Sequence, residues 1–397
     1  MTSLSFCAIV KDEEQSLPLC LASVRDVVDE MIVVDTGSKD KTREIAAKLG
    51  ARVYEFPWGD NFAQARNEAL KYASGDWILV LDADERLTSE ASCAIPDAIA
   101  NPQALVVNLV RHEVGATQSP YSLVSRLFRN HPELQFSRPY HATIDDSAIA
   151  LKQREPHWQV TEIDPVAILH YGYQPGAIAS KDKLQRAKRA MEGFLAQNPQ
   201  DAYVCNKLGA LYLQENRLED GLKLLQQGLN YCQDEPLLQF ELHYHVANAY
   251  TRKGDANQAA IQYQAALKQP ILPRLKLGAY NNLGSLLQNV GELSLAEGMY
   301  REALKIDEKF AIAHYNLGMI YNKQSRYEDA IAAYHNAIAL DENYAPAHQN
   351  LGVTYFKCGQ ISQSVAHFQK AIALYQESNP PEAERLTQTL QEMGLLS

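Results

Sequence analysis

The stretch DWILVLDADERL, residues 76–87, is the most informative segment in the first half of the chain. Its apolar run, WILVL, has the length and composition of a buried strand. The run ends in three carboxylates within four positions, at Asp82, Asp84 and Glu85. Carboxylates this close repel one another, and their desolvation is costly unless a cation lies among them. The stretch therefore predicts a site for a divalent metal ion at the end of a strand.

The segments around this strand alternate between apolar runs and helical patterns. DKTREIAAKLG (40–50) and FAQARNEALKYASG (62–75) have helical spacing, and each ends in a glycine that we expect to be a C-cap. Alternation of strands and helices predicts a mainly parallel sheet with right-handed crossovers. The other expected strands are LSFCAIV (4–10), EMIVVD (30–35), RVYEF (52–56), ALVVNLVRHEV (104–114) and SLVSRLF (122–128).

Beyond residue 200 the sequence repeats. Pairs such as Leu283-Gly284 recur five times, at spacings of 38, 37, 34 and 34 residues, and small residues follow each pair at fixed positions. Small residues let the two helices of a hairpin approach closely. Bulky residues such as Tyr300 and Tyr334 are expected to fill the gap to the next hairpin. The pattern resembles the tetratricopeptide repeat and predicts five copies, followed by a capping helix after Pro380-Pro381.

The bulk properties exclude several classes of protein. The net charge is −11, most of the acidic excess lies in residues 1–180, and no basic face is evident, so nucleic-acid binding is disfavoured. No apolar run reaches the length of a transmembrane helix, and the N-terminus does not resemble a signal peptide. The six cysteines lack metal-binding spacing, which indicates reduced thiols. We therefore expect a cytoplasmic protein, with peripheral association with the inner membrane face left open.

Two expected strands end in aspartate, at Asp35 and Asp82. Ligands of an open parallel sheet bind outside the carboxyl ends of its strands, so both residues are expected to face one crevice. Asp35 suits hydrogen bonds to a ribose or nucleobase, whereas Asp82 and Asp84 suit a metal ion that neutralises a diphosphate leaving group. The plainer alternatives are a helix cap at Asp35 and a solvated turn at residues 82–85.

The segments AIVKDEE (8–14), IVVDTGSKDKT (32–42), FPWGDNFAQARNEAL (56–70) and DWILVLDADERL resemble the family 2 glycosyltransferases of the GT-A fold, in this order and spacing. The resemblance covers about residues 1–175. It implies an α/β transferase with a Rossmann-like, mainly parallel sheet, followed by an all-α tetratricopeptide-repeat solenoid. It also implies inverting transfer of a sugar, of the hexosyltransferase type, from a nucleotide-diphosphate donor with Mg²⁺ or Mn²⁺; a UDP-sugar is the expected donor.

The resemblance assigns roles to individual residues. The expected contacts to the nucleotide-sugar are Lys11, Asp12, Glu14, Asp35, Arg66, Asn67 and Asp82. The expected metal ligands are Asp82, Asp84 and His170, with Asp84 the favoured direct ligand; a structural role for His170 is an alternative. Arg66 is chemically apt because a guanidinium offers a fork to phosphate, and a surface salt bridge is its alternative.

The acceptor side departs from the family pattern. RLFRN (126–130) and the following His141 resemble the family's acceptor segment, where the family usually has His-Glu, but here Ala142 follows the histidine. An inverting transfer needs a base near the acceptor hydroxyl. His141 and Asp145 are the principal candidates and Asp146 is a third, while a polar loop without catalytic function is the alternative.

Three successive repeats carry asparagine before the Leu-Gly pair, at Asn282, Asn316 and Asn350. This arrangement resembles the asparagine ladder of protein O-linked sugar transferases and implies binding of an extended peptide backbone. The alternative is that these amides only satisfy local groups. Two other functions stay open for the whole chain: a repeat scaffold with an impaired transferase domain, and a phosphohydrolase with an aspartate nucleophile.

The predicted organisation of the chain has four parts. They are a catalytic domain at 1–175, a connecting helix at 176–200, five tetratricopeptide repeats at 201–380 and a capping helix at 381–397. The sequence does not specify the sugar or the acceptor.

Overall fold

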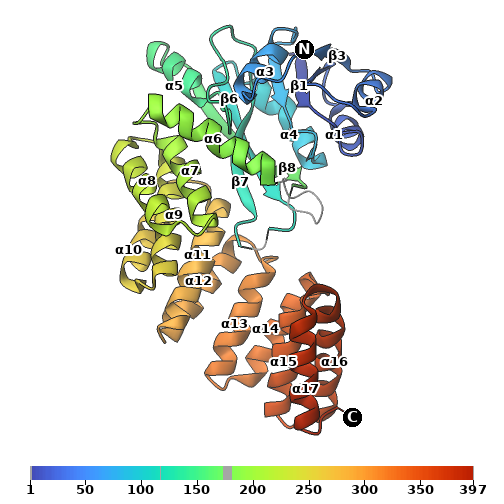
Figure 1. Ribbon diagram of the computed structural model, residues 1–397, viewed down its shortest axis with the longest axis vertical. Coiled ribbons are helices and arrows are strands. Elements are labelled where there is room, and N and C mark those ends of the chain that lie inside the picture. Colours follow the sequence, from blue (N-terminus) through green and yellow to red (C-terminus); the bar gives the residue numbers. More distant parts are fainter. Residues whose placement is uncertain (1, 117, 173–180, 397) are drawn as a thin grey trace. The chain divides into compact units, whose positions relative to one another are not determined.

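The computed structural model describes residues 2–116, 118–172 and 181–396. The chain divides into two compact units, Met1–Cys232 and Gln233–Ser397, which are described separately below (Figure 1). The predicted junction between catalytic domain and connecting helix, at residues 175–176, lies outside the described residues. Among the described helices, none is both long and apolar enough to cross a membrane.

The first unit is built on an eight-stranded sheet within the described residues, in the order β3-β2-β1-β4-β7-β6-β8-β5. Strands β1 to β4 pair in parallel, whereas β7 is antiparallel to both β4 and β6. The mostly parallel α/β architecture predicted from the sequence is confirmed. The strands are β1 (Leu4–Val10), β2 (Glu30–Asp35), β3 (Arg52–Glu55), β4 (Trp77–Val80), β5 (Glu85–Leu87), β6 (Ala104–Glu113), β7 (Tyr121–Arg129) and β8 (Gln159–His170).

Helices cover both faces of this sheet. On one face lie α1 (Leu17–Val24), α2 (Thr42–Lys48) and α4 (Ser89–Ala100), and on the other lie α3 (Phe62–Leu70) and α5 (Asp145–Arg154). Gly50, with φ +89°, follows α2 as the predicted C-cap. The second predicted glycine cap is wrong, because α3 ends at Leu70 and Gly75 instead packs against Ser5, where a Cβ would lie 2.7 Å from Ser5 Oγ.

Helix α6 (Lys181–Gln197) and the first repeat hairpin, α7 (Ala202–Gln214) and α8 (Leu218–Tyr231), complete the first unit. The second unit contains the remaining hairpins and a final helix, as the repeat pattern predicted (Figure 1). Its elements are α9 (Pro236–Lys253), α10 (Ala256–Leu267), η1 (Pro273–Lys276), α11 (Leu277–Asn289), α12 (Leu293–Ile306), α13 (Ala311–Lys323), α14 (Tyr327–Leu340), α15 (Ala345–Lys357), α16 (Ile361–Ser378) and α17 (Pro380–Glu392).

The repeat glycines allow a close approach within each hairpin. A Cβ at Gly318 would lie 2.5 Å from the Tyr334 ring, and a Cβ at Gly284 would lie 2.7 Å from the Tyr300 ring. The bulky ring therefore packs on the glycine of its own hairpin, and not only toward the next hairpin as the sequence suggested. This contact explains why small and bulky residues keep a fixed spacing in the sequence.

The three asparagines of the expected ladder donate hydrogen bonds between successive repeats. The Asn282 amide donates to the Tyr244 hydroxyl at 3.1 Å and to Asn248 at 3.2 Å. Asn316 is buried and donates to Asn281 at 2.8 Å, and Asn350 donates to the Tyr315 hydroxyl at 2.9 Å. These bonds stabilise the stacking of repeats, and a peptide-binding role for the three residues stays a prediction.

The second unit is expected to lose stability in acid. The Nδ1 atoms of His348 and His367 lie 3.1 Å apart, and the two rings stack at 5.3 Å. Burial, with the neighbouring imidazoles of His348 and His335, lowers the pKa of His367 to about 4. This folded pKa lies below the unfolded value of about 6.5. The contribution of neutral His367 to the free energy of unfolding is therefore complete above pH 6.5 and is lost as the pH falls toward 4. The loss is at most about 1.4 kcal/mol per pH unit.

Hydrogen exchange measured by mass spectrometry in peptides from α15 and α16 tests this expectation. We expect opening of these helices to increase between pH 6.5 and 4, after correction for intrinsic exchange. His367→Gln, which cannot become charged, should flatten the dependence. An equally steep dependence in that variant would contradict the assignment.

Candidate active site

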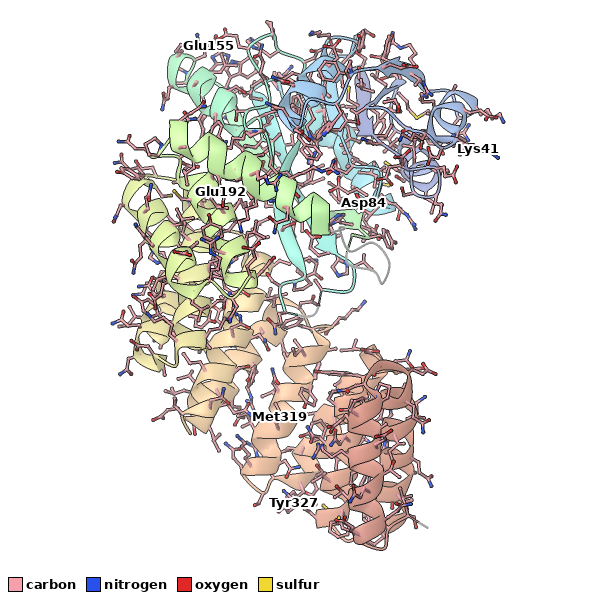
Figure 2. All side chains as sticks on the ribbon, viewed as in Figure 1. Lys41, Asp84, Glu155, Glu192, Met319 and Tyr327 are labelled. Atoms are coloured by element: carbon pink, nitrogen blue, oxygen red, sulfur yellow. The ribbon has the colours of Figure 1, made fainter. Side chains whose placement is uncertain are left out.

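The carboxyl edge of the parallel strands gathers the acidic residues that the sequence singled out. Asp35 is the last residue of β2, and Asp82 follows β4 in the same part of the sheet. After Asp82 the chain turns at once into β5, which pairs antiparallel with β8, so that Glu85 lies opposite His170. Figure 2 labels Asp84 at this turn.

Asp84 and His170 form a pair at this edge. His170 Nε2 lies 3.4 Å from Asp84 Oδ2, and the Asp84 side chain is 42% exposed. The other ring nitrogen, Nδ1, bonds the carboxylate of Glu113, which fixes the ring orientation. Burial alone would lower the pKa of His170, but the hydrogen bonds to Asp84 and Glu113 outweigh it and raise this pKa to about 10. A divalent ion could replace the proton on Nε2, because a carboxylate and an imidazole are both suitable ligands for Mn²⁺.

Gly172 packs closely against this pair. A Cβ at Gly172 would lie 2.6 Å from His170 Nε2 and 3.4 Å from Asp84 Oδ2. We expect Gly172→Ala to push the imidazole away from Asp84 and to weaken Mn²⁺-dependent nucleotide binding about 10- to 100-fold, which is the loss typical when a residue that orients a metal ligand is changed.

Isothermal titration of UDP with and without Mn²⁺ measures this effect. Gly193→Ala, in helix α6, is the matched control because a Cβ there would meet nothing within 4 Å. Unchanged Mn²⁺-dependent affinity in Gly172→Ala would show that the imidazole is not a ligand.

Asp82 bridges two arginines. Its Oδ1 accepts from Arg66 Nη2 at 2.6 Å, and its Oδ2 accepts from Arg126 Nη2 at 2.9 Å. Burial favours a raised pKa for Asp82, but the guanidinium charges outweigh it and hold the pKa of this carboxyl well below its usual range. The alternative for Arg66, a surface salt bridge to Glu68 or Asp60, does not hold, because Arg66 is buried against Asp82.

Three N–H groups of these arginines have no hydrogen-bond partner among the described residues: Arg66 Nε, Arg66 Nη1 and Arg126 Nη1. Unpaired buried donors are rare in proteins because desolvating them without a bond is costly. Guanidinium donors of this kind bind phosphate oxygens well. The arginines thus fit an anionic ligand such as a diphosphate.

A buried network of charged side chains, which the sequence did not reveal, lies behind the turn at Asp82. Glu85 is fully buried, and its carboxylate accepts from Arg111 Nη1 at 2.9 Å and from the Asp82 N–H at 2.8 Å. Arg111 also donates from Nε to Glu113 at 2.9 Å. The network thus joins the turn at Asp82 to the carboxylate that orients His170.

The residues expected to bind the nucleoside come together around one turn. Asp35 is buried, and its carboxylate accepts from the Ser38 N–H at 2.9 Å. Asp12 accepts from the Lys39 N–H at 2.7 Å, and Glu14 accepts from the Lys41 N–H at 3.1 Å. The segment of residues 11–14, which includes the exposed Lys11, therefore lies along the turn that follows Asp35.

The acceptor candidates lie in and beside a loop of residues 137–143, named here the acceptor-side loop. His141 is exposed in this loop, with a left-handed φ of +52°. Asp145 begins α5, and its carboxylate accepts from the hydroxyls of Ser125 and Thr143. Asp146 pairs with Arg138 at 2.7 Å, which commits this third candidate to an ion pair.

Asn67 contacts the protein's own backbone. Its amide accepts from the Phe136 N–H at 2.7 Å and donates to the Phe136 carbonyl at 2.9 Å. The residue therefore fixes the start of the acceptor-side loop, and contact with the donor stays a prediction.

Comparisons with known proteins assign both parts of the chain to known families. The model of the family "Glycosyl transferase family 2" matches residues 5–161, and two tetratricopeptide-repeat models match residues 277–309 and 309–379. A protein of Synechococcus elongatus named as TPR repeat-containing is 46% identical over 304 residues, which are 77% of this chain and 75% of that protein. The chain therefore belongs to the family 2 glycosyltransferases and carries C-terminal tetratricopeptide repeats.

Two further proteins, one similar in sequence and one in structure, match smaller parts of the chain. A protein of Rickettsia bellii named as an uncharacterized glycosyltransferase is 28% identical over 198 residues, 48% of this chain and 67% of that protein. The crystal structure of the MamA protein covers 45% of this chain and 94% of its own, at 20% identity and a TM-score of 0.39.

Proposed function

We propose that the protein is a metal-dependent, inverting glycosyltransferase that moves a sugar from a nucleotide diphosphate to an acceptor hydroxyl. A UDP-hexose is the proposed donor. The observation that carries the proposal is the Asp84–His170 pair, which lies at the sheet edge where Asp82 holds two arginines with unpaired N–H groups. A carboxylate, an imidazole and two guanidinium groups together suit a diphosphate that is bound to a divalent cation.

Asp84 and His170 would hold Mg²⁺ or Mn²⁺, with Asp82 beside them. The bond from His170 Nδ1 to Glu113 supports this assignment, because such a bond orients an imidazole that ligates a metal ion. When bound, the ion supplies positive charge that stabilises the diphosphate leaving group. Arg66 and Arg126 add donors to the same phosphate oxygens.

The nucleoside would lie against the surface that the turn after Asp35 and residues 11–14 form together. Backbone N–H groups of the turn already hold the carboxylates of Asp35, Asp12 and Glu14 in fixed positions. A base or ribose would therefore meet preoriented oxygen acceptors, which favours selective binding.

Asp145 is the proposed general base, with His141 as the second candidate. Ser125 and Thr143 orient the Asp145 carboxylate through their hydroxyls. In the proposed step the carboxylate takes the proton of the acceptor hydroxyl, and the hydroxyl oxygen bonds to the anomeric carbon. The bond from that carbon to the diphosphate breaks on the opposite face, so the configuration inverts.

The repeats are proposed to bind a polypeptide, either the acceptor or a partner protein. Tetratricopeptide repeats present extended surfaces that suit this role. The proposed contacts to this polypeptide are Asn282, Asn316 and Asn350. They would use the amide donors and acceptors that are not already bonded between repeats.

Thermal unfolding with a panel of nucleotide diphosphates and their sugars, with and without Mn²⁺, tests the proposal. A ligand of the folded state at 100 times its Kd stabilises by about 2.7 kcal/mol, so the matching nucleotide should raise the Tm by several degrees. Mn²⁺-dependent release of free sugar from the same donor would establish turnover. A Tm shift without turnover on any acceptor would favour the scaffold function, and no shift with any nucleotide would refute donor binding.

A further inference from the structure

The acceptor-side loop has a backbone that needs external support. Arg138 and His141 both adopt left-handed conformations, with φ of +70° and +52°. Such conformations are unfavourable for residues other than glycine, and they persist where the surroundings hold them. The two ends of the loop join through a bridge between Ser137 and Thr143, with N–H to carbonyl distances of 2.9 and 3.4 Å.

One side of the loop is held by the transferase domain. The Pro139 carbonyl accepts from the Phe62 N–H at 2.9 Å, and the Tyr140 ring packs edge-on against Phe62 at 5.4 Å. Burial, followed by the negative charge of Asp82, raises the pKa of Tyr140. Arg66, which pairs with Asp82, lies over the ring of Phe136, the residue before the loop, at 5.4 Å. The loop therefore borders the candidate active site directly.

The other side of the loop is held by one buried arginine. The Arg138 side chain is 8% exposed and donates to Asp146 in α5 at 2.7 Å. Its Nε donates to Asp201 at 3.0 Å, and its guanidinium lies over the Tyr203 ring at 4.7 Å. Asp201 is the N-cap of α7, the first helix of the first repeat, and accepts from the Val204 N–H at 2.8 Å. A single guanidinium thus joins the loop, α5 and the first repeat.

Apolar contacts extend this connection. Tyr140 and Tyr203 pack on a cluster formed by residues of α6 and α7, including Met191, Val204 and Leu208. Glu192 of α6, labelled in Figure 2, accepts from the Tyr212 hydroxyl of α7 at 2.7 Å. The first hairpin therefore belongs to the compact unit of the transferase, in agreement with the end of that unit at Cys232.

We propose that Arg138 is a positioning residue that uses Asp201 of the first repeat to hold the acceptor-side loop in its productive conformation. The first repeat then acts as part of the transferase in addition to its place in the repeat array. The inference deepens the proposed function and rests on it for its catalytic consequence, because the loop carries His141 and leads into Asp145. The stability of the loop conformation is a separate property, and it can be measured without any substrate.

Asp201→Asn is the decisive variant. Asparagine is as good an N-cap as aspartate, so α7 keeps its cap while Arg138 loses the charge of its partner. Asp255→Asn is the matched control, since Asp255 caps α10 in the same way, through the Gln258 N–H at 3.0 Å. Within the described residues no ion pair involves Asp255.

The first measurement is hydrogen exchange in peptides that cover residues 137–143. We expect exchange about 10-fold faster in Asp201→Asn and unchanged in Asp255→Asn, since weakened support raises local opening. Unchanged exchange in Asp201→Asn would overturn the proposal. This result does not depend on activity, so it separates failure of the inference from failure of the proposed function.

The second measurement is Mn²⁺-dependent hydrolysis of UDP-glucose, or of the donor that thermal unfolding selects. We expect Asp201→Asn to lower kcat about 10-fold and to leave the donor KM unchanged, because the loop orients the attacking side and not the nucleotide. In an Arg138→Gln background, Asp201→Asn should have no further effect, because the aspartate acts through the arginine. Full kcat in Asp201→Asn, or additive losses in the double variant, would overturn the positioning role.

Discussion

Asp84→Asn is expected to lower metal-dependent turnover by about 100- to 1,000-fold and to leave the stability of the fold unchanged. An ion that stabilises leaving-group charge contributes several kcal/mol to the barrier, and each 1.36 kcal/mol is a factor of 10 in rate. The Asp84 side chain is 42% exposed and contacts His170, so its amide would leave no cavity and no buried unpaired charge. Donor hydrolysis with Mn²⁺, together with thermal unfolding, measures both effects.

Asp76→Asn is the matched control for this experiment. Asp76 precedes β4 at the opposite end of the same strand, where it accepts from the Ser3 N–H at 2.9 Å. The substitution removes the same charge from the same strand at the edge away from the site. Turnover within a few-fold of wild type in Asp84→Asn would refute the metal assignment, and an equal loss in Asp76→Asn would attribute the effect to net charge.

The sequence predicted the parts of the site that lie at the ends of parallel strands. Asp35 and Asp82 each end an apolar run, and such a run that stops at a carboxylate identifies the functional edge of an open sheet. The same rule could have found Glu113, because ALVVNLV in β6 is followed by the polar residues Arg111, His112 and Glu113.

Arg126, the second partner of Asp82, could not be predicted because its place depends on strand pairing. Arg126 comes from β7, which joins the sheet antiparallel to β4 and brings the guanidinium 44 residues along the chain to Asp82. Parallel pairing of β6 with β8 likewise brings Glu113 beside His170. Register between strands distant in sequence is set by the packing of both faces, which a single sequence does not display.

The repeats were predictable because their packing is local. Gly318 and Tyr334 are 16 residues apart, belong to one hairpin and contact each other directly, so the contact leaves a periodic mark in the sequence. The ion pair between Arg138 and Asp201 leaves no such mark, because it joins a loop of the transferase domain to a repeat 63 residues later.

Asp82→Asn is expected to lower the stability of the first unit, whereas Asp84→Asn is not. Asp82 compensates the charges of Arg66 and Arg126, and Arg66 is 6% exposed. Removing one partner of a fully buried pair costs about 3–5 kcal/mol, because the remaining charge is left uncompensated. Since the Asp82 side chain is 34% exposed, water screens part of this cost, and we expect about 2 kcal/mol.

A loss of this size should lower the Tm by about 4–8 °C for a unit of this length. Sulfate or pyrophosphate should restore part of the loss without metal, because either anion can supply the negative charge that the substitution removes from beside Arg66 and Arg126. The two variants together decide among the interpretations of residues 82–85. A solvated turn predicts two stable, active variants, and two equivalent metal ligands predict two stable, inactive ones. If Asp82 pairs with the arginines and Asp84 binds the metal, both variants should be inactive, and Asp82→Asn alone should be unstable. No other interpretation predicts this combination.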